Sequence, residues 1–242
     1  ETMTIIAHLV KQLLADQGVP LSAVAGKGVG LAGHVLYRQG MVITTSNFKV
    51  PFVRYPLTQK LGAHFPGTRV LLDNDANAQA LGEYMFGAGR GCDSMVFMTI
   101  STGIGAGIVL GGRMWRGRSG TAGEIGHSIV DIRSTHRCTC GNYGCAMALS
   151  SGLFLPELYA EKLRAGMTSC IDVDEFNVDR MCGELLEHGM KCRDEISLAV
   201  IDDSADVVGT SVFNVFQLLN PDVVVLGGRS EEHTSELQSR QV

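Results

Sequence analysis

The sequence lacks three features that would each restrict its class. No apolar run approaches the roughly 20 residues that a transmembrane helix requires, which argues against a membrane protein. No basic stripe is present and the formal net charge is −5, so we do not expect this part of the chain to bind nucleic acid. Internal repeats and low-complexity segments are also missing. A hydrophobic content of 45% and a charged content of 19% then describe a globular protein with ample material for a core.

A disulfide framework is missing too, although the chain contains seven cysteines. Three of them are clustered in one short segment, and the other four are scattered without a framework pattern: Cys92, Cys170, Cys182 and Cys192. This usage suits a reducing compartment better than an oxidising one, so we predict a cytoplasmic location.

Both ends of the chain are unusual. It begins at Glu1 without an initiator methionine and enters a helical pattern at once, so we expect the true N-terminus to be missing. Residues 229–242 are polar, show no periodicity and resemble the conceptual translation of a common sequencing adapter. We therefore expect this segment to be an artefact and exclude it from the fold prediction, the alternative being a natural disordered tail.

Helical patterns alternate with short apolar runs along the chain. The patterns predict helices over Met3–Leu14, Pro56–Leu61, Ala76–Phe86, Gly152–Leu163, Asp174–Glu187 and Asp194–Leu219. The apolar runs predict strands over Val24–Leu31, Val42–Thr45, Arg69–Leu72, Met95–Ile100, Gly105–Leu110 and Asp222–Leu226, the first of them buried and followed by a turn after Gly33. This alternation predicts an α/β fold that binds ligands at the carboxyl ends of its strands.

One segment carries the residue types of a metal site. His127, Cys138, Cys140 and Cys145 supply the four ligands that a tetrahedral Zn²⁺ prefers, and the glycines between them allow tight bends. A closed four-ligand site leaves no position for a substrate water, so we predict a structural zinc ion. The alternative is a reactive or disulfide-forming cysteine cluster beside a core histidine.

Two loops at predicted strand ends are candidates for chemistry. In 73–77, an aspartate could take the proton of an attacking hydroxyl while asparagines hold its neighbours, but Asp and Asn are equally typical of helix capping. In 101–107, glycines would let backbone N–H groups approach phosphate oxygens, although a tight β-hairpin explains the pattern as well. Glu124 and His127, three positions apart, are able to share a face. His127 could bind the metal through one ring nitrogen and a ligand hydroxyl through the other, which would tie the zinc loop to the substrate pocket.

Four motifs in this order resemble the ROK family of bacterial sugar kinases and sugar-responsive repressors. They occupy Asn74–Ala78, Ser101–Gly107, Ala122–His127 and Cys138–Cys145. The resemblance covers nearly all of residues 1–228 and implies a two-lobed actin-like ATPase (ribonuclease H-like) fold, incomplete in this chain. It implies an N-terminal α/β lobe over residues 1–94 and a larger α/β lobe with the zinc loop over residues 95–228.

The resemblance also implies ATP-dependent phosphorylation of a sugar hydroxyl, as in a glucokinase, with Mg²⁺-bound ATP, a structural Zn²⁺ and a homodimer or higher homo-oligomer. The sugar would be a hexose or an N-acetylhexosamine. Asp75 would be the general base. The sugar-binding positions would be Asn74, Glu124, His127, Asn47 and Gly33. The nucleotide-binding positions would be Thr102, Gly103, Gly105, Gly227 and Gly228.

The chain departs from the family pattern in several places. The first phosphate loop, Asp-x-Gly-Gly-Thr, is not in the chain, so we expect this fragment alone to have little or no kinase activity. Met147 stands where the family usually has a glutamate, which leaves the sugar open. The interval between His127 and Cys138 is about one residue longer than usual, which makes His136 an alternative metal donor. The alternative function is the sugar-sensing domain of a ROK transcriptional repressor.

Overall fold

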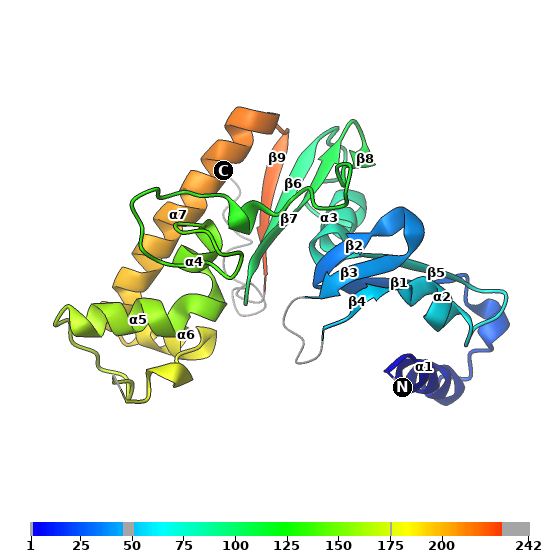
Figure 1. Cartoon of the computed structure of the whole chain (residues 1–242), viewed down its shortest axis with the longest axis horizontal. Coiled ribbons are helices and arrows are strands. Elements are labelled where there is room, and N and C mark those ends of the chain that lie inside the picture. Colours follow the sequence, from blue (N-terminus) through cyan, green and yellow to red (C-terminus); the bar gives the residue numbers. More distant parts are fainter. Residues whose placement is uncertain (1, 46–50, 175, 229–242) are drawn as a thin grey trace.

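The computed structural model describes residues 2–45, 51–174 and 176–228. Asn47, one of the predicted sugar contacts, lies outside the described residues, and so does the segment 229–242. Figure 1 shows a central sheet with the N-terminal elements on one side of it and the helices α4 to α7 on the other. Within the described residues, no helix combines the length and the apolar composition that a membrane crossing requires.

The N-terminal elements form two small sheets around one core. Their bounds are α1 (Thr2–Asp16), η1 (Leu21–Ala23), β1 (Gly26–Leu31), β2 (Gly33–Leu36), η2 (Tyr37–Gln39), β3 (Met41–Thr45), β4 (Val53–Tyr55), α2 (Leu57–Gly62) and β5 (Arg69–Asn74). Strands β1 and β5 pair in parallel, while β2, β3 and β4 form an antiparallel sheet. Apolar side chains from both helices and both sheets fill the core, among them Met3, Val42, Leu61, Phe65 and Leu72.

The two middle strands of the central sheet are mostly buried. The sheet has the order β8-β7-β6-β9, with bounds β6 (Met95–Ile100), β7 (Ile104–Leu110), β8 (Arg113–Met114) and β9 (Val223–Gly227). Met95 and Phe97 of β6 cluster with Ala80 of α3 (Asp75–Phe86), whereas Val96 and Met98 cluster with Val215 of α7 (Glu195–Leu219). Since successive side chains of a strand point to opposite faces, this apolar run places one helix on each side of the sheet.

The remaining elements are η3 (Ile125–His127), α4 (Ala146–Ser150), η4 (Gly152–Phe154), α5 (Leu155–Arg164), η5 (Val178–Arg180) and α6 (Gly183–Lys191). Helices α4, α5 and α6 contact α7, whereas η3 contacts β7 and α4. The buried Asp194 caps α7 by accepting a hydrogen bond from the backbone N–H of Ser197. The same carboxylate accepts hydrogen bonds from the Tyr159 hydroxyl (2.9 Å) and the Cys170 N–H (2.7 Å), which joins α5, α7 and the loop between them.

The α/β class predicted from the sequence is confirmed, but three local predictions are wrong. A strand, β2, replaces the turn expected after Gly33. Strand β1 is not buried, because it alternates between exposed and half-buried residues and pairs only with β5 among the described strands. The helix expected over 174–187 begins only at Gly183, since the Asp174 carboxylate accepts the N–H groups of Phe176 and Asn177 in a local turn. The division into lobes at residue 94 stays a prediction.

Candidate functional site

The loop from β5 into α3 contains the predicted general base. Asn74 is the N-cap of α3, and its Oδ1 accepts the N–H groups of Ala76 (2.9 Å) and Asn77 (3.4 Å). Its Nδ2 donates to the carbonyl oxygen of Gly33 (3.2 Å), which brings two predicted sugar contacts together. Asp75 is half-buried, and its Oδ1 accepts a hydrogen bond only from Ala76 N–H (3.1 Å) within the described part of the chain. Capping therefore explains Asn74, while the second carboxylate oxygen of Asp75 has no hydrogen-bond partner among the residues that the structure describes.

The glycine-rich loop is the tight turn between β6 and β7. Ser101 N–H donates to the carbonyl oxygen of Gly103 (2.8 Å), so the hairpin alternative describes the local structure. Thr102, a predicted phosphate contact, is exposed at the tip. The carbonyl groups of Ser101 and Thr102 accept the N–H groups of Gly152 (2.8 Å) and Leu153 (2.9 Å), which fixes the loop against η4.

The other predicted nucleotide contacts lie beside this turn. Strands β6 and β9 are parallel and pair Thr99 with Gly227, so both strands end at the same edge of the sheet. Gly228 has a φ of 144°, and a Cβ atom there would collide with the backbone of Ile100. The structure thus brings Gly227 and Gly228 to the strand end that carries the Ser101–Gly103 turn.

The base loop and the glycine-rich loop are joined by close backbone packing. A Cβ atom built on Gly105 would lie 3.5 Å from the Cβ of Ala76, in the first turn of α3. Asp75 immediately precedes Ala76, so the start of α3 lies against the strand that leaves the predicted phosphate loop. The predicted base and the predicted phosphate loop are therefore neighbours.

A third loop, Gly123–His127, packs along β7. Its Gly123 carbonyl oxygen accepts a hydrogen bond from Ala106 N–H (2.8 Å), and a side chain at Gly126 would collide with the carbonyl oxygen of Ile104. The Oε2 of Glu124 lies 3.9 Å from Nε2 of His127, and the Glu124 side chain is 47% exposed. The predicted sugar contacts Glu124 and His127 do share one face, as their spacing indicates.

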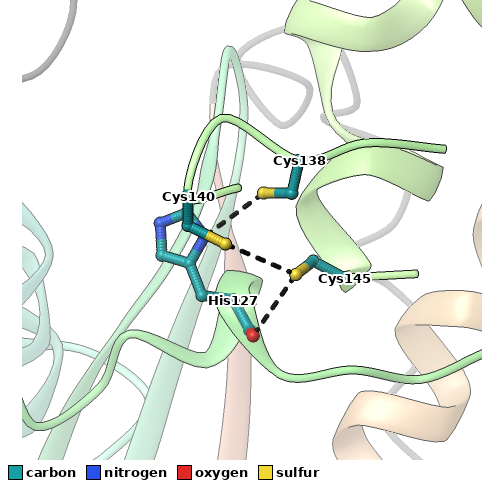
Figure 2. Close-up of side chains that lie close together, drawn as sticks. All are labelled: His127, Cys138, Cys140 and Cys145. Carbon is teal, nitrogen blue, oxygen red and sulfur yellow. Dashed lines mark hydrogen bonds between the residues drawn. The ribbon is translucent and has the colours of Figure 1, made fainter. Parts of the chain in front are cut away.

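The four predicted metal ligands converge on one point (Figure 2). Their donor atoms all lie within 4.8 Å of one another. The Nδ1 of His127 is 3.4 Å from the Cys138 sulfur, and the Cys140 and Cys145 sulfurs are 3.7 Å apart. Tetrahedral coordination at the usual Zn–S bond length separates sulfurs by about 3.8 Å, so the donor set fits such an ion. His127 directs its other nitrogen, Nε2, toward Glu124.

Local backbone and burial explain how these thiols are held. Gly141 (φ 92°) and Gly144 (φ 70°) adopt left-handed conformations, and a Cβ atom on Gly144 would collide with the carbonyl oxygen of Asp131. Burial, together with the neighbouring thiols of Cys140 and Cys138, raises the pKa of the Cys145 thiol to about 12. The pKa of Cys140 is lowered: burial opposes this, but hydrogen bonds from Asn142 and the other two thiols outweigh it. Without a cation, ionisation of all three neighbouring thiols is unfavourable, because the thiolates repel one another. A bound divalent metal would offset this repulsion.

Some expectations about this region need adjustment. His136, the alternative metal donor, is not in the cluster: its Nε2 lies 3.1 Å from Oε2 of Glu161 and its Nδ1 3.7 Å from Oε1 of Glu157, both on α5. Met147 contacts the glycine-rich loop, where its sulfur accepts the N–H of Ile104 (3.3 Å). The sequence singled out Met147 but did not indicate that it touches this loop.

Sequence reasoning missed one residue that touches the base loop. Arg116 binds Asp73, whose carboxylate lies two positions before Asp75 (Arg116 Nη2 to Asp73 Oδ2, 2.6 Å). The two residues are 43 positions apart, and no motif or periodicity links them. Only the fold reveals this contact.

Fold and loops together define an α/β protein of the actin-like ATPase class, the fold of solved ROK-family structures. The chain belongs to the ROK family, whose model matches residues 1–239.

Relatives within the family have two different activities. The chain is 33% identical over 208 residues to a putative xylose repressor from a Caldicellulosiruptor species, covering 86% of this chain and 51% of that protein. It is 33% identical over 201 residues to a glucokinase from Thermotoga maritima, covering 83% of this chain and 62% of the glucokinase. The chain thus spans between half and two thirds of the length of these curated relatives.

A solved structure matches most of this chain. The ROK family glucokinase from Streptomyces griseus, solved with glucose and AMPPNP, superposes with a TM-score of 0.77 at 28% identity. The match covers 94% of this chain and 72% of the glucokinase chain. Similarity to kinases and to a repressor leaves the activity of this protein to be argued from its site.

Proposed function

We propose that this chain is part of an ATP-dependent sugar kinase, with Asp75 as its general base. The observation that carries the proposal is the contact between the first turn of α3 and Gly105 of β7. This contact places the Asp75 carboxylate, which accepts one hydrogen bond within the described residues, beside the turn proposed to hold phosphate. A phosphoryl-transfer site needs these two functions as neighbours, because catalysis consists mainly of positioning and charge stabilisation.

The chemistry assigned to each group is as follows. The Asp75 carboxylate takes the proton from a sugar hydroxyl while that oxygen forms a bond to the γ-phosphorus of ATP. The bond between the γ-phosphorus and the β–γ bridging oxygen breaks, and ADP leaves with the electron pair. Mg²⁺, when bound with ATP, neutralises charge on the phosphates.

The remaining roles follow from position. Asn74, Glu124 and His127 are proposed to hold sugar hydroxyls, and Gly33 is included because its carbonyl oxygen is bonded to Asn74. Thr102, Gly103, Gly105, Gly227 and Gly228 are proposed to face the nucleotide, since they gather at the shared ends of β6 and β9. Zinc at His127 and the three cysteines would hold the Glu124–His127 loop without taking part in the chemistry.

A second function is supported by the putative xylose repressor, which is as similar to this chain as the Thermotoga glucokinase. In a sugar-sensing domain the same residues would bind sugar without phosphoryl transfer. The sugar would be a hexose or N-acetylhexosamine under the kinase proposal, and a pentose would favour the sensor.

One experiment separates the two functions. The protein, expressed from its complete gene, is assayed for ADP release against a panel of hexoses, N-acetylhexosamines and xylose, and sugar binding is measured calorimetrically in parallel. Sugar-dependent ADP release supports the kinase. Sugar binding with no ADP release from any sugar would contradict it and favour the sensor.

A further inference from the structure

Arg116 connects two of the loops described above. It follows β8, and its Nε and Nη2 donate to Oδ2 of Asp73 at 2.9 and 2.6 Å. Its guanidinium lies over the ring of Tyr37, with Cζ 3.9 Å from the ring centroid. Asp73 lies in β5, Tyr37 follows β2 and Arg116 follows β8, so one side chain joins all three sheets.

The other oxygen of Asp73 holds the base loop. Its Oδ1 accepts the N–H of Asn74 (2.9 Å) and the side-chain amide of Asn77 (3.0 Å), which is 2% exposed. Asp73 therefore bonds residues on both sides of Asp75, at the start of α3. The position of the Asp75 backbone depends on a carboxylate that Arg116 anchors.

The backbone of Arg116 also contacts the segment next to the Gly123–His127 loop, which is the proposed sugar loop. The Arg116 carbonyl oxygen accepts the N–H of Ala122 (3.2 Å), the residue immediately before Gly123–His127. One residue thus binds the base loop through its side chain and the proposed sugar loop through its main chain. Arg116 is thus one of the links between the two loops, beside their shared packing on β7.

Burial and charge give this contact more weight than a surface ion pair. The side chains of Arg116 and Asp73 are 22% and 16% exposed, so removing the arginine would leave a mostly buried carboxylate unpaired. The planar guanidinium also stacks on an aromatic ring, which an ammonium group cannot reproduce in the same way. Within the described part of the chain, the ion pair of Arg116 is with Asp73 and not with Asp75, so the arginine does not neutralise the proposed base.

We infer that Arg116 is a positioning residue: through Asp73 it fixes the Asp75 carboxylate relative to the sugar held by Glu124 and His127. The inference rests on the proposed kinase function. Small displacements of a reacting group lower the rate of the chemical step by about 10- to 100-fold, even when binding is retained. Loss of the arginine should therefore act on kcat and leave the KM values for sugar and ATP nearly unchanged.

The test compares Arg116→Gln and Arg116→Lys with Arg118→Gln in the complete protein. Arg118 is an exposed arginine in the same loop, and its side chain makes no hydrogen bond or ion pair with the residues that the structure describes. We expect kcat to fall about 10- to 100-fold in Arg116→Gln, less in Arg116→Lys, and less than twofold in Arg118→Gln. Thermal denaturation and active-site titration separate this effect from partial unfolding, which would reduce the active fraction but not the kcat of that fraction.

A double-mutant comparison tests whether Arg116 acts through Asp75. In an Asp75→Asn background, Arg116→Gln should cause no further loss, because the group that it positions is already gone. Equal losses in both backgrounds, or an Arg116→Gln enzyme as fast as Arg118→Gln, would overturn the inference while leaving the kinase proposal intact. A wild-type protein without sugar-dependent ADP release would instead contradict the kinase proposal, and the inference with it.

Discussion

Gly107 of β7 lies directly against Ala80 of α3. A Cβ atom built on Gly107 would collide with the Ala80 Cβ and lie 2.8 Å from the carbonyl oxygen of Ala76. This close approach brings the start of α3, with Asp75, onto the strand that leaves the glycine-rich turn.

Gly107→Ala should therefore destabilise the protein by about 1–3 kcal/mol, because α3 cannot stay at this distance from β7 when a methyl group is added. Gly82→Ala is the matched control. Gly82 lies in α3, the helix that packs against Gly107, and a Cβ atom on Gly82 would meet nothing within 4 Å. This control should be neutral or stabilising by up to about 1 kcal/mol, since alanine favours helix. Chemical denaturation of both variants measures the difference, and equal stability would contradict the packing described.

The cysteine cluster predicts a defined metal content. Wild-type protein should retain about one zinc ion per chain through purification, and Cys138→Ser and Cys145→Ser should lose it, because each removes one of four ligands. Cys182→Ser is the control, since Cys182 is exposed and lies outside the cluster. Elemental analysis gives the stoichiometry. Folded wild-type protein without metal would show that the four residues are only a thiol cluster.

Asp194 predicts a dependence of stability on pH. Burial of this carboxyl opposes ionisation, but hydrogen bonds from Ser197 and Cys170 outweigh it and hold its pKa well below the usual range. Its stabilising contribution is thus complete above the unfolded pKa, about 3.9, and is lost as the pH falls toward the folded value. Asp194→Asn should cost about 2–3 kcal/mol at pH 7, and the difference from wild type should shrink below about pH 4.

The control for this prediction is Asp203→Asn on the same helix. Asp203 pairs with Lys162 at the surface, and its side chain is 62% exposed. An exposed ion pair contributes about 0–1 kcal/mol, so this variant should show little change at any pH. A constant difference between wild type and Asp194→Asn down to pH 3 would contradict the assignment of the shift to ionised Asp194.

Short-range patterns account for what could be predicted from the sequence. The cluster of His127 with three cysteines and the helix expected from Asp194 depend on residues close in the chain, so their spacing indicates their geometry. The helix predicted over 174–187 was wrong at its start. There the Asp174 side chain accepts backbone N–H groups and forms a turn, although the apolar pattern favoured a helix. The contact between Asp73 and Arg116 spans 43 positions and depends on how three sheets meet, which no local pattern specifies.

The most direct test of the account is the rate of sugar-dependent ADP release by Asp75→Asn, in protein expressed from the complete gene. Loss of the general base should lower kcat by about 100-fold or more, while calorimetric sugar affinity changes little, because the amide keeps the shape of the side chain. Asp93→Asn, an exposed aspartate before β6, should retain wild-type activity. An Asp75→Asn protein that releases ADP at the wild-type rate would contradict the assignment of Asp75 as the base and, with it, the proposed mechanism.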